Sequence, residues 1–230
     1  MPIKIDAGAF KTEISDRGIT SLVHFTPTIN LLSILTEQKI YSRAKLEELG
    51  IQQTDLLDFV SFTDPIRYDD KSYINFSIEF PNHYLFSRFR ARTLPLIHIH
   101  WCVVKCDPRL IYLDNTLFSV TNAASISAKR DFGITGDLAK FRLMFAPQLD
   151  VRTTSSSRTV VRDRLPAKYP TDVQAEVLVK DSIPISEVIA ICFENTAEME
   201  STKAAILAAN HDAGISKFCV DQKLFQVTRL

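Results

Sequence analysis

Apolar and polar residues alternate strictly between residues 73 and 80, where four large apolar side chains share one face: Ile74, Phe76, Ile78 and Phe80. A period of two over this length predicts a strand with one buried side. Apolar runs predict two further strands at 21–26 and 97–106. Towards the C-terminus, strands are predicted at three more segments: 186–193, 217–220 and 224–228.

Between these strands, apolar residues at helical spacing predict four helices. The segment 29–38 carries a broad apolar face, and Thr28 can cap its N-terminus. The segment 43–50 ends at Gly50, a residue typical of helix C-termini. The other two predicted helices are 136–145 and 197–210. Because helices and strands do not alternate regularly, the pattern favours an α+β fold over a doubly wound sheet.

A single globular domain spanning 1–230 accommodates this pattern. The chain has 230 residues, 46% of them hydrophobic, which is enough for a sizeable core. Residues 1–20 are expected to form a loosely attached N-terminal segment. Residues 129–176 are largely irregular, and long irregular stretches inside a compact domain are often functional. This region is therefore a candidate for substrate recognition.

Charge is unevenly distributed although the total is balanced, with 27 basic and 27 acidic residues. Residues 129–168 contain nine Lys and Arg against four Asp and Glu, and the run 87–92 contains three arginines. Such segments can meet phosphate, or they are solvated loops that balance acids elsewhere. No signal-like N-terminus and no apolar run of about 20 residues is visible. The lack of such segments, together with four cysteines in apolar contexts, favours a cytoplasmic protein without membrane association.

Signatures of several common sites are missing from the chain. It contains no G-x-G-x-x-G, G-x-x-x-x-G-K-[ST] or G-x-S-x-G motif, which argues against a Rossmann site, a P-loop and a hydrolase elbow. His98, His100 and Cys102 share one face of a predicted strand at a spacing that suits a metal. Because no second pair completes a four-ligand set, a packed strand face is the better interpretation and no metal is expected.

Glu176 lies in the middle of an apolar strand predicted at 171–181. Burying an unpaired charge is costly, so such a carboxylate is usually paired, at an edge, or lining a cleft. The local pattern leaves these three alternatives open.

Two further polar residues have both a structural and a functional interpretation. His24, at the end of the strand 21–26, is either a satisfied structural histidine or, with Thr26 and the helix behind it, part of a ligand shelf. Arg67 precedes the next strand among several acidic residues. It either forms surface ion pairs of little value or faces a cleft as a cation.

Five segments, in this order, resemble the DarT family of bacterial DNA ADP-ribosyltransferases, which are toxins of toxin–antitoxin modules. They fall roughly between residues 20 and 195 and read HFTPTINLLSIL, DPIRYDD, INFSIEFPN, FSVTNAAS and YPTDVQAEVLV. The resemblance implies an α+β ADP-ribosyltransferase fold with a split central sheet and NAD in its cleft. It also implies transfer of ADP-ribose from NAD⁺ to a base of single-stranded DNA, thymine in one branch of the family and guanine in another.

The resemblance also assigns roles to individual residues. Glu176 would be the catalytic glutamate and Arg67 the catalytic arginine, with Arg43 as the alternative. Arg43 is retained because the family arginine lies in a longer, Arg-rich insertion, whereas this chain is shorter and acidic there. The NAD-binding residues would be His24, Phe25, Thr26, Ser33, Tyr41 and Arg67.

On the DNA side, the basic region after residue 128 would order the acceptor strand. The residues expected to bind DNA are Asn122, Arg130, Arg152, Arg158 and Arg162. The expected partners are NAD⁺, single-stranded DNA and a macrodomain antitoxin that removes the modification, and the protein is expected to be a monomer. Two alternatives stay open: a transferase of the same fold that modifies protein or RNA, and an inactive module that binds single-stranded nucleic acid.

Overall fold

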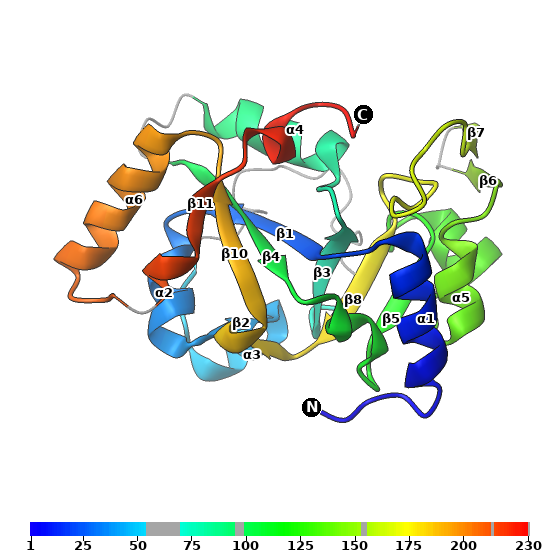
Figure 1. Ribbon diagram of the computed structural model, residues 1–230, viewed down its shortest axis with the longest axis horizontal. Helices are drawn as coiled ribbons and strands as arrows, with labels where there is room; N and C mark the ends of the chain where they lie inside the picture. The colour runs from blue at the N-terminus through cyan, green and yellow to red at the C-terminus, as the bar shows by residue number, and fades with distance from the viewer. Residues whose placement is uncertain (54–69, 95–98, 153–155, 213, 230) are drawn as a thin grey trace.

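A seven-stranded, mostly antiparallel sheet runs through the protein (Figure 1). The structure is a computed structural model and describes residues 1–53, 70–94, 99–152, 156–212 and 214–229. Within these residues the strand order is β11-β10-β4-β1-β3-β8-β5, and β10 and β11 form the parallel pair. The strands are β1 (Leu22–Pro27), β3 (Tyr73–Ile78), β4 (Trp101–Cys106), β5 (Leu117–Ser119), β8 (Glu176–Lys180), β10 (Val188–Phe193) and β11 (Phe218–Val220).

Six α-helices and two small two-stranded sheets surround this sheet in the described part of the chain. The helices are α1 (Ala7–Arg17), α2 (Asn30–Glu37), α3 (Arg43–Leu49), α4 (His83–Thr93), α5 (Leu138–Leu143) and α6 (Thr196–Ala208). One small sheet pairs β2 (Lys39–Tyr41) with β9 (Ser182–Pro184), and the other is a hairpin of β6 (Gln148–Arg152) and β7 (Ser157–Val161). A π-helical turn, Ser127–Phe132, precedes α5.

Both faces of the sheet are buried, because alternate residues of the central strands enter two different apolar clusters. On β1, Leu22 joins a large cluster with residues of α1, α2 and α5, whereas Val23 joins a smaller one under α4. The side chains of a strand point alternately to opposite faces, which explains this division. The sheet is thus the middle layer between helices.

The central sheet opens between β1 and β3. β1 pairs with β4 over six residue pairs, from Leu22 to Pro27, but with β3 over only two, at Leu22 and Val23. Beyond Val23 the two strands separate, and this is the split in the sheet that the sequence analysis expected.

Most of the predicted elements are confirmed. The strands predicted at 21–26, 73–80, 186–193 and 217–220 correspond to β1, β3, β10 and β11, and all four predicted helices are present. Gly50 ends α3 with a φ of 65°, a left-handed conformation that glycine adopts without steric cost. The strand predicted at 97–106 begins at Trp101 in β4, and its first two positions lie outside the described residues.

Three expectations are corrected. Residues 1–20 are not loosely attached, because they form α1, whose Phe10 is fully buried against Phe118 and Phe141. The segment 224–228 is not a strand, since Gln222–Phe225 form a 3₁₀ turn that buries two apolar residues. The region 129–176 is less irregular than expected, since besides the predicted helix α5 it contains the β6–β7 hairpin.

Helix α4 was not predicted. Arg88, Arg90 and Arg92 alternate with its last residues, which conceals the apolar face that contains the buried Phe86 and Phe89. The Asn82 side chain caps the helix by accepting a hydrogen bond from the Leu85 N–H at 3.3 Å. Among the described residues, no helix is long and apolar enough to cross a membrane.

Candidate active site

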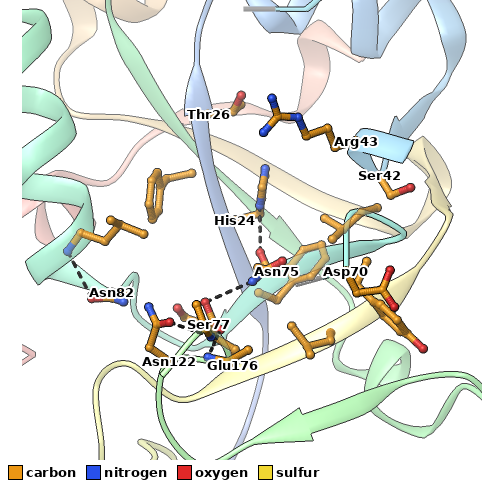
Figure 2. A pocket seen from close by; sticks show the side chains of 18 of the residues that line it. His24, Thr26, Ser42, Arg43, Asp70, Asn75, Ser77, Asn82, Asn122 and Glu176 are labelled. Carbon is orange, nitrogen blue, oxygen red and sulfur yellow. Dashed lines mark hydrogen bonds between the residues drawn. The ribbon is translucent and has the colours of Figure 1, made fainter. Parts of the chain in front are cut away.

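A cavity of about 1290 Å³ opens where β1 and β3 separate. Small-molecule pockets typically measure about 300–1,000 Å³, so this cavity has room for a dinucleotide and part of a second substrate. Figure 2 shows the side chains that surround it, which come from β1, β3, β8, α3 and the start of α4. The lining of the cavity includes His24, Phe25, Thr26, Tyr41, Arg43, Asn75, Asn122, Arg158 and Glu176.

Glu176 is the first residue of β8, and the segment before it is a turn rather than the predicted strand. Its side chain is 8% exposed and lines the cavity. One carboxylate oxygen accepts a hydrogen bond from Asn75 Nδ2 at 3.2 Å, and the other from the Ala123 N–H at 2.7 Å. Burial raises the pKa of this carboxyl above its ordinary value, although the two hydrogen bonds oppose that shift.

Glu176 differs from two other buried glutamates of the chain. Glu187 forms an ion pair with Arg109, and Glu79 forms one with Lys168. Among the described residues, no Lys or Arg forms an ion pair with Glu176. Of the three alternatives that the sequence left open, the structure therefore selects a carboxylate that lines a cleft.

His24 lies across the split in the sheet. Its Nδ1 is 2.9 Å from the main-chain oxygen of Asn75, and since a carbonyl only accepts, Nδ1 carries the proton. Burial lowers the pKa of this imidazole, so the ring is neutral at pH 7 and Nε2 is an acceptor. His24 can thus receive a hydrogen bond from a ligand in the cavity.

The residues that follow His24 shape the cavity wall. Phe25 stacks on Phe86 of α4, with ring centroids 4.6 Å apart, and presents an apolar surface to the cavity. Thr26 is buried, and its hydroxyl accepts a hydrogen bond from Asn30 Nδ2 at 3.1 Å. The predicted shelf formed by β1 and α2 is therefore present.

The remaining predicted NAD residues divide into two groups. Tyr41 and Arg43 line the cavity, whereas Ser33 lines an adjoining hollow of about 290 Å³ and accepts a hydrogen bond from Gln53 Nε2. The hollow shares Asn30, Gln52 and Gln53 with the cavity, and the role of Ser33 in binding NAD stays a prediction. Arg43 begins α3, where Glu47 is its ion-pair partner at 3.6 Å, while Arg67 lies outside the described residues.

A family model described as "ssDNA thymidine ADP-ribosyltransferase, DarT" matches residues 23–225. The chain belongs to the DarT family. Its members are described by that model as transferases that modify thymidine in single-stranded DNA. The search among curated proteins returned no match.

Solved DarT structures share the fold. Thermosipho africanus DarTG in complex with ADP-ribose is 18% identical over 90% of this chain, with a TM-score of 0.55, and this chain spans about half, 51%, of that chain. Thermus sp. 2.9 DarT in complex with NAD⁺ is 13% identical over 90% of this chain and 98% of the other, with a TM-score of 0.54. Thermus sp. 2.9 DarT in complex with ADP-ribosylated ssDNA is 12% identical over 91% of this chain and 97% of the other, with a TM-score of 0.53. The expected α+β fold is confirmed.

Two of the residues expected to bind DNA line the cavity of this DarT-family chain. Asn122 lies next to Ala123, whose N–H donates to Glu176. The Asn122 Oδ1 accepts a hydrogen bond from the Ala124 N–H at 2.9 Å. Arg158, on β7, donates to Asp172 at 2.6 Å. Their contact with DNA stays a prediction, but the fold brings both to the end of the cavity that holds Glu176.

The other three expected DNA contacts lie elsewhere. Arg162 donates to the main-chain oxygens of Tyr169, Pro166 and Ala167, so the structure gives it the role of holding that loop. Arg152 is exposed and pairs with Asp131 at 2.9 Å. Arg130 is exposed, and neither it nor Arg152 lines the cavity, so their contact with DNA stays a prediction.

Sequence reasoning missed several residues of the site. Asn75 lies on the polar face of the strand predicted at 73–80, so the alternation contained a signal that a polar side chain faces away from the core there. The Ala123 N–H carries no sequence signal, because its role depends on the path of the chain. Arg88 lines the cavity from α4 and belongs to the basic run noted in the sequence. Among the described residues, no group of three or more His, Cys, Asp or Glu side chains could hold a metal.

Replacement of Asn75 by Ala is expected to shift the acidic limb of the pH–rate profile to higher pH. The substitution removes a hydrogen bond to ionised Glu176 and keeps the main-chain oxygen used by His24, so the pKa of Glu176 rises further. If the reaction needs ionised Glu176, activity is lost as the pH falls through that raised pKa. The measurement is kcat/KM for NAD⁺ between pH 5 and 9. An acidic limb at the same pH in wild type and Asn75→Ala would contradict the prediction.

Proposed function

We propose that this chain transfers ADP-ribose from NAD⁺ to thymine in single-stranded DNA and that Glu176 is its catalytic carboxylate. The observation that carries this proposal is the buried Glu176, bound by Asn75 and the Ala123 N–H but by no cation among the described residues, at the wall of a cavity of dinucleotide size. The match to the thymidine-modifying family favours thymine over guanine.

The chemistry requires a group of this kind. When the bond between ribose C1′ and the nicotinamide nitrogen breaks, its electrons leave with neutral nicotinamide and positive charge develops on the ribose. A fixed carboxylate stabilises that oxocarbenium character, as the carboxylates of glycosidases do. Because Glu176 is desolvated and held by two donors, it needs little reorganisation during the reaction.

The other residues of the cavity receive supporting roles. His24 and Thr26, with Phe25 and Tyr41, hold NAD⁺ on the β1 side of the split. Arg43 supplies a cation to the same cavity, while the assignment of Arg67 as catalytic arginine stays a prediction outside the described residues. The acceptor nitrogen of the base bonds to C1′ and loses its proton to solvent or to a base of the protein.

The test is incubation with labelled NAD⁺ and single-stranded oligonucleotides that contain one type of base each, followed by mass spectrometry. The expected product is an ADP-ribosyl adduct on thymine and one equivalent of nicotinamide. RNA and the protein itself are included as acceptors. Label on RNA or protein would support the first alternative, and salt-sensitive binding of oligonucleotides without nicotinamide release would support the second.

We also propose that the transferase acts in the cytoplasm as a monomer and that a macrodomain protein reverses the modification. The likeness to Thermosipho africanus DarTG, whose structure contains ADP-ribose, supports this partner. Expression of this chain alone is expected to stop bacterial growth, and co-expression of a macrodomain hydrolase to restore it. Growth inhibition that persists together with cleared DNA adducts would contradict the proposal.

A further inference from the structure

Asp172, four residues before Glu176, is a fully buried carboxylate beside the cavity. It accepts hydrogen bonds from the Thr121 hydroxyl at 2.7 Å, from Arg158 Nη2 at 2.6 Å and from the Gln174 N–H at 3.0 Å. A buried charge with this set of partners has a fixed position. Asp172 therefore fixes the guanidinium of Arg158 in turn.

Arg158 reaches Asp172 from the β6–β7 hairpin. On β7 the pleat turns Arg158 and Val160 towards the body of the protein, while Ser157, Thr159 and Val161 face solvent. The Arg158 side chain is 36% exposed and lines the cavity. In the described part of the chain Nη2 bonds to Asp172, which leaves the other donors of the guanidinium for a ligand.

Arg158 lies at the end of the cavity where the reaction would occur. The short segment 121–123 binds both carboxylates, since the Thr121 hydroxyl donates to Asp172 and the Ala123 N–H donates to Glu176. One turn of chain thus holds the partner of Arg158 next to the proposed catalytic group. A ligand group that contacts Arg158 is therefore close to the reacting carbon.

We propose that Arg158 is a specificity-determining residue that donates a hydrogen bond to a carbonyl oxygen of the acceptor base. This proposal rests on the proposed function. A guanidinium carries only donors. It can therefore donate a hydrogen bond to the carbonyl oxygen that flanks a ring N–H in thymine, but not to the amino group that adenine and cytosine carry at the corresponding position. Donation to that carbonyl also stabilises the negative charge that develops when the ring nitrogen loses its proton and bonds to C1′.

A base is a better ligand for Arg158 than a phosphate of the DNA strand. Arg158 is held inside the cavity by a buried carboxylate, whereas phosphates stay at the mouth, where exposed arginines such as Arg88 lie. Phosphate contacts position a strand without reading its sequence, whereas a fixed, partly buried guanidinium can read the edge of a base.

The test compares wild type with Arg158→Ala on oligonucleotides that carry one thymine, one 2-thiothymine or one 4-thiothymine. Sulfur is a weak acceptor at the position of O2 or O4 in these analogues. Arg158→Ala is expected to lower kcat/KM for thymine transfer about 10- to 100-fold. For one of the thio-bases, the ratio of kcat/KM between wild type and Arg158→Ala is expected to fall towards one. Hydrolysis of NAD⁺ in the absence of DNA is expected to be unchanged.

Three results would overturn the proposal. If the ratio of kcat/KM between wild type and Arg158→Ala is equal for thymine and both thio-bases, Arg158 binds phosphate or is structural. If the variant loses NAD⁺ hydrolysis or has a raised KM for NAD⁺, Arg158 serves the dinucleotide. An unaltered rate for Arg158→Ala would mean that it has no role. Thr159→Ala, the outward-facing neighbour on β7, is the matched control and should behave as wild type.

Asp172 is a positioning residue in this scheme, and Thr121→Val tests it without removing the buried charge. Loss of the Thr121 hydroxyl is expected to reduce thymine transfer several-fold and to leave NAD⁺ hydrolysis intact. If wild type transfers no ADP-ribose to DNA, the proposed function fails. If wild type transfers ADP-ribose to DNA but the ratio of kcat/KM between wild type and Arg158→Ala is the same for all three bases, only the role of Arg158 in reading the base fails.

Discussion

Glu176→Gln is expected to abolish detectable transfer of ADP-ribose, with a loss of at least about 10²–10³ in rate. Glutamine has the shape of glutamate and can still accept a hydrogen bond from the Ala123 N–H, so the cavity keeps its geometry while the negative charge is lost. The measurement is single-turnover release of nicotinamide, with and without a thymine oligonucleotide.

Glu176→Gln is expected to raise the stability of the folded protein, although it lowers the activity. Because burial raises the pKa of Glu176, the folded protein holds this proton more tightly than the unfolded chain does. The ionised carboxyl therefore costs stability as the pH rises from the ordinary pKa of Glu to its raised value. Glu176→Gln should match or exceed the Tm of wild type at pH 8, with a smaller advantage at pH 5.

Glu187→Gln is the matched control, because Glu187 is also buried but its carboxylate pairs with Arg109 away from the cavity. This variant should have a lower Tm and normal activity per folded molecule. A Glu176→Gln protein that unfolds would show that Glu176 is structural, and one that folds and retains activity would show that its charge is not needed for catalysis.

Phe10→Ala is expected to destabilise the protein by about 3–5 kcal/mol, the usual cost of removing a buried phenylalanine. Phe10 is fully buried, and its ring centroid lies 5.6 Å from those of Phe118 and Phe141. Phe118 lies on β5, the strand next to β8, so loosening α1 also loosens the support behind Glu176.

Urea denaturation measures this effect, and Ser15→Ala on the exposed face of the same helix is the control, with an expected change within about 0.5 kcal/mol. An unchanged urea midpoint for Phe10→Ala would mean that α1 does not contribute to the folded core in solution.

Local patterns predicted the elements well where their periodicity was undisturbed. The strict alternation at 73–80 produced β3, the apolar spacing produced α2, and the stop signal at Gly50 ended α3. The predicted cap by Thr28 is wrong, since Ile29 is the N-cap of α2 and no side chain among the described residues caps the helix. The prediction failed where another feature concealed the pattern. The arginines at 88, 90 and 92 concealed α4. A short apolar run at 224–228 looked like a strand, although its first two residues belong to the 3₁₀ turn Gln222–Phe225.

The candidate site was predicted in part. Glu176 and His24 were selected by the order of the motifs and by their unusual place in apolar strands, and both line the cavity. Ser33 was placed in the pocket by position alone, and it lines a small hollow beside the cavity, with which that hollow shares Asn30, Gln52 and Gln53. Arg162 was selected for its charge, but main-chain oxygens of its own loop occupy its donors.

By itself the sequence determined the α+β class, most of the strands and helices, and membership of the DarT family, because these follow from local periodicity and from the order of short motifs. The tertiary structure alone decided that β1 and β3 separate, that Asn75 binds a carboxylate 101 positions away, and that α1 completes the core. A local pattern specifies which face of an element is buried but not which distant element covers it. Only the folded chain brings those partners together and excludes water from Glu176.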